Sequence, residues 1–338
     1  MTQPPRNKIL VGDALDRLHQ LPSESVDMVL TSPPYYQLRN YGVGGQLGQE
    51  ANIHEWVSNL TAVAAEVGRV LTPTGTFWLN VADRYSIHDK EGSPRKSLLL
   101  GPARLSAALA ADGWLVRNQI IWSKTNPMPS SVPDRLTTTY EVVFLLTKQR
   151  SYFFDLDAIR VPHTSKPTTP QASAKDSIPQ QWRARSTDNI RGLVSLKQRG
   201  IVGHPLGKNP GDVWQLPTSS YRGAHFATFP ERLAERAILA GSPEARCSNC
   251  FKPHCRVTRR LGATAIRGAL LATCLCQAPS EPAIVLDPFM GAGTTAVSAE
   301  RHGRDWLGVE LNPEFAELAD SRIAAARPFR ASPESTAA

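Results

Sequence analysis

The stretch AIVLDPFMGAGTT, residues 283–295, decides the fold, because an apolar run leads through two glycines into a helical pattern. The apolar run predicts a buried strand, and the glycines let a ligand approach the backbone closely. The N–H groups that begin the next helix favour an anionic group. Glu310 ends the next expected strand 19 positions after Gly291, where a carboxylate can hold ribose hydroxyls. The stretch therefore predicts a cofactor loop, with an ordinary strand-to-helix turn as the alternative.

Triphosphate binding is disfavoured, because no Gly-Lys-Ser/Thr follows the glycines.

A second short motif also follows an apolar strand. Residues 25–30 run into Thr31-Ser32-Pro33-Pro34-Tyr35, where two prolines disfavour helix and strand pairing and favour a rigid, exposed turn.

Apolar periodicity predicts alternating strands and helices along most of the chain. The expected strands are 8–11, 25–30, 76–81, 114–122, 140–147, 283–286 and 306–310, and the expected helices include 54–71, 98–111, 230–240, 294–302 and 313–326. This alternation predicts an α/β fold with a doubly wound, largely parallel sheet and crossover helices.

The composition indicates a globular chain with a polyanion among its candidate partners. The 338 residues are 41% hydrophobic and carry a net charge of +8. No run of 18 apolar residues occurs, and the first ten residues lack the apolar core of a secretory signal, so we expect a cytoplasmic protein with no membrane partner. The five cysteines all lie between Cys247 and Cys276, which favours a reducing compartment over a secreted disulfide framework.

The turn at 31–35 and the loop at 287–295 together resemble the amino-methylating DNA methyltransferases, which act on N4 of cytosine or N6 of adenine. The resemblance extends over nearly all of residues 8–326, and the turn precedes the loop as in the permuted beta arrangement of that family. It implies a Rossmann-like, S-adenosylmethionine-dependent methyltransferase sheet. In such a sheet the carboxyl ends of both strands meet at the ligand crevice.

The resemblance also implies roles for individual residues. The catalytic residues would be Ser32, Pro33, Pro34 and Tyr35, with the Ser32 hydroxyl and the Pro33 carbonyl accepting the hydrogens of the target amine and Tyr35 stacking on a flipped base. The cofactor-binding residues would be Asp13, Phe229, Pro230, Asp287, Pro288, Phe289, Gly291, Gly293, Thr294 and Glu310. Asp13 would contact the cofactor adenine, although it also fits the N-cap of the following helix.

Ser32 favours cytosine N4 as the target, because family members that act on adenine usually carry Asp or Asn at this position. No Pro-Cys pair of the kind used for cytosine C5 methylation is present. The alternatives are an adenine N6 methyltransferase, an RNA or protein methyltransferase, and a DNA-binding module with a decayed site. The implied partners are duplex DNA and a cognate restriction endonuclease, and the implied assembly is a monomer or homodimer.

Residues 151–212 interrupt the α/β rhythm and predict an inserted target-recognition region, so the catalytic domain would comprise 1–150 and 213–326. The insert carries nine basic residues against five aspartates; the basic residues are Arg160, Lys166, Lys175, Arg183, Arg185, Arg191, Lys197, Arg199 and Lys208. Arginines of this kind contact phosphates and guanines, although a solvated loop has a similar composition. The last residues, 327–338, are expected to form a disordered tail.

A Cys-rich segment within residues 244–280 predicts a small zinc-ribbon-like module. Its ligands would be two close pairs, Cys247 with Cys250 and Cys274 with Cys276. His254 and Cys255 are alternative ligands, and a metal-free cluster is the competing interpretation. Four thiolates would make a bound zinc structural, because a catalytic zinc keeps one position open.

Overall fold

The computed structural model describes residues 3–163, 204–218, 229–261 and 264–327. The chain divides into two compact units. Unit 1 comprises Met1–Asp155, Gly211–Cys255 and Ala272–Ala338, and unit 2 comprises Leu156–Pro210 and Arg256–Leu271. Most of the predicted insert and of the predicted tail lies outside the described residues. None of the described helices has both the length and the apolar content needed to cross a membrane.

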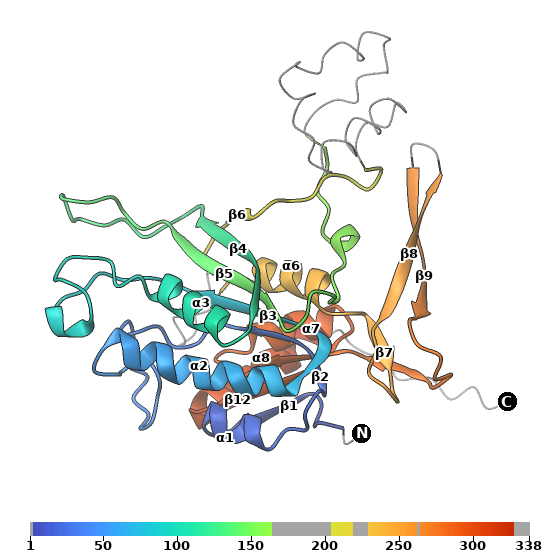
Figure 1. Cartoon of the computed structure of the whole chain (residues 1–338), viewed down its shortest axis with the longest axis horizontal. Helices are drawn as coiled ribbons and strands as arrows, with labels where there is room; N and C mark the ends of the chain where they lie inside the picture. Colours follow the sequence, from blue (N-terminus) through green and yellow to red (C-terminus); the bar gives the residue numbers. More distant parts are fainter. Residues whose placement is uncertain (1–2, 164–203, 219–228, 262–263, 328–338) are drawn as a thin grey trace, which may run out of the picture. The chain divides into compact units, whose positions relative to one another are not determined.

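Unit 1 is built on a sheet of eight strands among the described residues (Figure 1). Across the sheet they lie in the order β1 (Lys8–Val11), β12 (Asp305–Glu310), β11 (Ile284–Asp287), β2 (Val26–Thr31), β3 (Leu71–Val81), β5 (Tyr140–Thr147), β4 (Leu115–Lys124) and β6 (Val213–Leu216). The first five are parallel, β5 is antiparallel to both of its neighbours, and β6 is parallel to β4. The doubly wound, largely parallel sheet predicted from the sequence is therefore confirmed.

Helices cover both faces of this sheet (Figure 1). One layer contains α1 (Ala14–His19), α2 (Ile53–Val70) and α3 (Gly101–Ala111), and the other contains α6 (Glu231–Gly241), α7 (Thr294–Arg301) and α8 (Pro313–Ala326). Two single-turn 3-10 helices, η1 (Asp89–Glu91) and η2 (Leu156–Ala158), lie in the connections. The crossover helices follow the predicted ranges closely.

Helix α2 shows how the sequence produces this packing. The Asn52 side chain caps its first turn by accepting hydrogen bonds from the backbone N–H groups of His54 and Glu55. Its apolar residues recur at helical spacing, and those that are buried are Ile53, Trp56, Leu60, Val63, Ala64, Val67 and Val70. They form one side of the main core beneath β2 and β3.

The structure departs from the sequence-based expectations at two strands. β3 begins at Leu71 instead of Thr76 and contains Pro73, so the chain turns directly from α2 into the sheet. β6 follows the insert and was not expected, because its four residues, Val213–Leu216, are too few to show a period. The Cys-rich segment also contains more regular structure than predicted: β7 (Ala245–Cys247) pairs with β10 (Ser280–Pro282), and β8 (His254–Leu261) pairs with β9 (Thr264–Ala272).

Among the described residues of unit 2, the Asp157 carboxylate joins two segments of the chain. It accepts hydrogen bonds from Arg160 Nε at 2.5 Å and from Thr258 Oγ1 at 2.7 Å, and His204 Nε2 lies 3.9 Å away. Burial opposes the charge on Asp157, but the hydrogen bonds from Arg160 and Thr258 outweigh it and lower the pKa of the carboxyl. Residues of the insert are thus bonded to β8, through residues 101 positions apart in the chain.

Strand β6 is held in the sheet by Trp214, which is 2% exposed. Its ring stacks on Trp78 of β3, with the two ring centroids 6.1 Å apart. The guanidinium of Arg236, on α6, lies 4.9 Å from the centroid of the Trp214 ring. Stacked aromatic and cation–π contacts add to the burial of apolar area.

We predict that Trp214→Ala lowers the free energy of unfolding by about 3–5 kcal/mol, since it leaves a large cavity under the edge of the sheet. Val213→Ala, on the same strand but 56% exposed, should change it by no more than about 0.5 kcal/mol. Urea unfolding followed by tryptophan fluorescence and circular dichroism measures both. Similar losses for the two variants would show that β6 is not an integral part of the sheet.

Candidate active site

The carboxyl ends of β2 and β11 lie side by side, as the sequence predicted for the two motif-bearing strands. The strands are parallel, with Val285 opposite Met28. Beyond the paired residues, Asp287 at the end of β11 accepts a 2.6 Å hydrogen bond from the Thr31 hydroxyl at the end of β2. The other Asp287 oxygen accepts a bond of the same length from Thr295 Oγ1. One buried carboxylate therefore joins the proline turn to the glycine loop.

The glycine loop bends through two residues with positive φ, Gly291 at 51° and Gly293 at 75°. A Cβ on Gly293 would lie 3.1 Å from the Cβ of Ala319, so this position combines a left-handed backbone with close packing on α8. Glu310, at the end of β12, accepts hydrogen bonds from the backbone N–H of Gly291 at 2.7 Å and of Asn312 at 2.9 Å. Burial raises the pKa of Glu310.

These elements surround an open cavity with an empty volume of about 870 Å³. The predicted site residues that line it are Asp13, Ser32, Pro34, Phe229, Asp287, Pro288, Phe289, Gly291, Thr294 and Glu310. Further lining residues that the sequence analysis did not name include Tyr41 and Phe315, whose rings meet edge to face with centroids 6.1 Å apart. The cavity thus combines aromatic walls with three carboxylates, those of Asp13, Asp287 and Glu310.

Four predicted site residues, Pro33, Tyr35, Pro230 and Gly293, lie outside the lining of this cavity. Pro230 instead begins α6 as its N-cap residue. Asp13 both lines the cavity and caps α1, since its Oδ1 accepts hydrogen bonds from the backbone N–H groups of Leu15 and Asp16. The capping role considered in the sequence analysis is therefore present.

A network of polar side chains lies beneath the proline turn. The Ser32 hydroxyl donates to the Tyr35 hydroxyl at 2.8 Å, and the Tyr35 hydroxyl donates to Glu141 Oε2 at 2.7 Å. Asn80 Nδ2 donates to the Tyr35 hydroxyl at 2.7 Å and to Glu141 Oε2 at 2.8 Å. The other Glu141 oxygen pairs with Lys124 Nζ at 2.8 Å. A continuous path of hydrogen bonds thus joins Ser32 to a carboxylate.

This network keeps the Tyr35 hydroxyl protonated. Burial, together with the neighbouring Glu141 carboxylate, raises the pKa of Tyr35 well above its usual value. Tyr35 therefore donates a hydrogen bond to Glu141, and the hydrogen bonds to its hydroxyl hold the side chain in place.

The backbone of the turn is fixed by Trp56 on α2. Its Nε1 donates a 2.9 Å hydrogen bond to the carbonyl of Pro34, and its ring is 1% exposed. No donor within the described part of the chain bonds to the carbonyl of Pro33. The Pro34 carbonyl is thus used within the fold, and the Pro33 carbonyl is left available to another molecule.

Three residues of this network were not predicted from the sequence: Asn80 on β3, Glu141 on β5 and Lys124 on β4. One signal was present: Glu141 stands in the otherwise apolar strand sequence YEVVFLLT, and a charge there indicates a partner. That this partner is Tyr35, 106 residues earlier, depends on the strand order.

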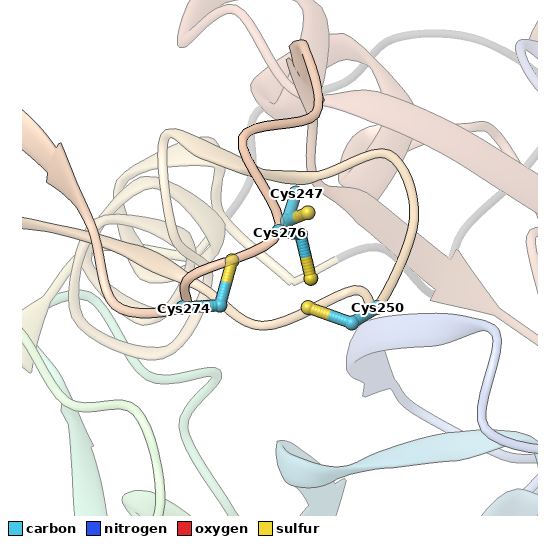
Figure 2. A group of neighbouring side chains, drawn as sticks. All are labelled: Cys247, Cys250, Cys274 and Cys276. Atoms are coloured by element: carbon cyan, nitrogen blue, oxygen red, sulfur yellow. The ribbon is translucent and has the colours of Figure 1, made fainter.

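The four cysteines predicted as metal ligands also come together. Their sulfur atoms all lie within 4.8 Å of one another, and Figure 2 shows the four side chains directed toward a common point. Hydrogen bonds from the backbone N–H groups of Cys250 and Asn249 lower the pKa of the Cys247 thiol to about 7. This group could hold a metal ion, and Cys255 is not a member of it.

The doubly wound sheet and the glycine loop beside a proline turn define a class, the methyltransferase fold of S-adenosylmethionine-dependent enzymes. The sequence pattern of the DNA methylase family matches residues 26–321. The chain therefore belongs to the DNA methylase family of amino-methyltransferases, as the sequence analysis predicted.

Two relatives are similar over most of their length. The type II methyltransferase M.SmaI of Serratia marcescens is 34% identical, covering 94% of this chain and 90% of the relative. The type II methyltransferase M.XycI of Xanthomonas campestris pv. cyanopsidis is 33% identical, covering 92% and 86%.

Among solved structures, the cytosine-N4-specific PvuII DNA methyltransferase has a TM-score of 0.58 at 19% identity, covering 96% of this chain and 92% of that chain. A Thermus thermophilus protein solved in complex with S-adenosyl-L-methionine has a TM-score of 0.54 at 24% identity, covering 96% and 95%. At these identities the two structures establish the fold alone.

We predict that Asp287 makes the stability of the protein depend on pH. Burial raises the pKa of Asp287 to about 6, although its hydrogen bonds act in the opposite direction. The unfolded carboxyl has a pKa of about 4, so the native state takes up a proton between pH 7 and pH 5 that the unfolded chain does not. The stability from this proton is present below the unfolded pKa and is lost as the pH rises through about 6.

When the pH is lowered from 7 to 5, the wild type should therefore gain about 1 kcal/mol in free energy of unfolding relative to Asp287→Asn. Urea unfolding of both proteins at pH 5, 6 and 7 measures this difference. Glu317→Gln, on the exposed face of α8, is the matched control. A difference between wild type and Asp287→Asn that stays constant, or grows at higher pH, would contradict the assignment.

Proposed function

We propose that this protein transfers a methyl group from S-adenosylmethionine to N4 of cytosine within a specific site in duplex DNA. The observation that carries the proposal is the position of Ser32, which lines the same cavity as Asp287, Gly291 and Glu310. A hydroxyl that can engage an amine thus borders the site that would hold the methyl donor. The relatives named as type II methyltransferases support methyl transfer, and the choice of cytosine N4 agrees with the description of the PvuII enzyme, which shares this fold, as cytosine-N4-specific.

The cavity residues fit S-adenosylmethionine. Each Glu310 oxygen uses one lone pair on a backbone N–H, which leaves capacity on both for ribose hydroxyls. Phe289 and Phe315 provide apolar contact for a purine. When bound, this cofactor supplies an electrophilic methyl group. Both carboxylate oxygens of Asp287 accept hydrogen bonds from threonines. We therefore assign Asp287 a positioning role: it holds the glycine loop beside the methionine end of the cofactor.

The proline turn would activate the target amine. The lone pair of an exocyclic amine is delocalised into the base, so an enzyme must hold the two hydrogens in a geometry that localises it. The Ser32 hydroxyl and the Pro33 carbonyl are the acceptors, and the Trp56 bond to the next carbonyl fixes their directions. The base would reach them by flipping out of the duplex and stacking on the ring of Tyr35.

The polar network then provides a route for the proton. As the new N–C bond forms, the amine nitrogen becomes positive and must release one hydrogen. Ser32 Oγ accepts this proton and passes its own to the Tyr35 hydroxyl, and Tyr35 passes its own to Glu141 Oε2. Asn80 holds the two acceptors of this route in place, and Lys124 holds Glu141 from the other side.

We assign target recognition to unit 2, where residues of the insert are bonded to the hairpin β8–β9 through Asp157. The hairpin carries Arg256, Arg259 and Arg267, and arginine suits phosphate and guanine contacts. By analogy with its type II relatives, the enzyme would work beside a restriction endonuclease that recognises the same DNA site.

The reaction predicts a defined product. Purified protein incubated with duplex DNA of diverse sequence and labelled S-adenosylmethionine should yield N4-methylcytosine after digestion to nucleosides and mass spectrometry. Ser32→Ala should lower kcat by roughly 100-fold or more, because an acceptor at the reacting amine is lost. N6-methyladenine as the product would overturn the choice of base, and labelled RNA or protein without labelled DNA would overturn the substrate.

The proton route predicts different results for two adjacent tyrosines. Tyr35→Phe keeps an aromatic ring but interrupts the route, so kcat should fall roughly 10- to 100-fold and the pH–rate profile should change shape. Tyr36→Phe is the matched control, because its hydroxyl donates to the carbonyl of Ala51 and does not touch the network. Single-turnover rates from pH 6 to 9 measure both, and equal profiles for the two variants would exclude the route.

A further inference from the structure

We propose that Cys247, Cys250, Cys274 and Cys276 bind one structural zinc ion that braces the amino-terminal ends of β2 and β11. The four sulfurs lie within 4.8 Å of one another and point to a common centre (Figure 2). Sulfurs at the corners of a tetrahedral site with zinc–sulfur bonds of about 2.3 Å are about 3.8 Å apart, so small movements of the side chains complete the site. Four thiolates leave no open position, which makes the ion structural.

Zinc is the ion that the surroundings favour. Soft thiolate ligands in a tetrahedral set select zinc or iron, and the Cys-x2-Cys turn of residues 247–250 is typical of zinc sites. The turn is preformed: the Phe251 N–H bonds to the carbonyl of Cys247 at 3.0 Å, and the Cys247 N–H bonds to the carbonyl of Lys252 at 3.0 Å. Two of the ligands therefore have their backbone fixed without the ion.

The site ties together two distant parts of the chain. Cys247 lies opposite Ser280 in the β7–β10 ladder, and the Ser248 N–H bonds to the carbonyl of Pro279. One cysteine pair precedes the hairpin β8–β9 and the other follows it. An ion shared by both pairs would hold together the two ends of the segment between Cys250 and Cys274, which contains the hairpin.

Arg246 connects the cysteine cluster to the catalytic sheet. It is next to Cys247, it is fully buried, and its guanidinium lies 4.1 Å from the ring centroid of Phe251 in the same turn. Its Nη1 donates to the carbonyl of Ser25 at 2.6 Å and pairs with Asp27 Oδ2 at 2.9 Å. The same Asp27 oxygen accepts a 2.8 Å bond from the N–H of Ile284.

This linkage explains how a metal can act on the site without entering the cavity. Asp27 lies near the start of β2, and Thr31 ends it about 13 Å away along the strand. Ile284 starts β11, which ends at Asp287. Because a buried charge without its partner is costly, an Arg246 displaced by loss of the ion would release both strand ends. The inference is independent of which base is methylated.

The first measurement is the zinc content of the full-length protein by mass spectrometry after exhaustive dialysis. We expect about one zinc per chain, release of the ion when the four cluster thiols are titrated with a mercurial in addition to Cys255, and retention of it in Cys255→Ser. The double variant Cys274→Ser/Cys276→Ser should bind less than about a tenth as much. Its melting temperature should fall by roughly 10 °C, while Cys255→Ser stays within about 2 °C of wild type.

Hydrogen exchange tests the brace itself. Removing zinc from the wild type with a chelator should speed exchange in peptides covering 245–254 and 276–287 and at the start of β2, and leave α8 unchanged. This measurement also serves if the double variant fails to fold. The proposal is overturned if the chain holds no zinc while all five thiols are free, if it holds iron, if Cys255→Ser loses the ion as readily as the double variant, or if β2 exchange does not respond.

Discussion

The active site depends on one buried carboxylate, that of Asp287, bonded by hydroxyls from two directions. The Thr31 bond brings the end of β2 against β11, and the Thr295 bond fixes the first turn of α7. Without these bonds, two neighbouring strands would still pair through their backbones, but the proline turn would lose its side-chain link through Asp287 to the glycine loop. The chemistry needs that setting, because a reacting amine and a methyl donor must approach to within about 3–3.5 Å.

Much of this arrangement follows from the sequence, because it is encoded in contiguous segments. The apolar run before Asp287 and the apolar run before Thr31 each identify a parallel strand, and the carboxyl ends of parallel strands meet at one edge of a sheet. The cysteine cluster was also predictable, since ligand spacing is a local property. Strand boundaries were less so: β6 has too few residues for a pattern, and β3 tolerates Pro73 near its start.

The supporting shell of the site could not be predicted, because it is assembled from different strands. Asn80 and Glu141 meet Tyr35, and Lys124 meets Glu141, only because β5 lies between β3 and β4, antiparallel to both and in one register. A register shifted by one residue would turn Glu141 to the opposite face of the sheet. Arg246 is a similar case, since its contacts with Ser25 and Asp27 span more than 200 residues.

The way the insert joins its own ends has an evolutionary consequence. Val161 and Lys208 pair through their backbones in an isolated bridge, so the chain between them starts and finishes at one place. Lengthening a closed loop costs little, about 0.6 kcal/mol for each doubling. Selection can therefore replace, extend or shorten this segment without altering the strands that carry the chemistry. Under the target-recognition role proposed for unit 2, a lineage could change its DNA target by exchanging this contiguous piece of gene, while the methyl-transfer machinery is inherited unchanged.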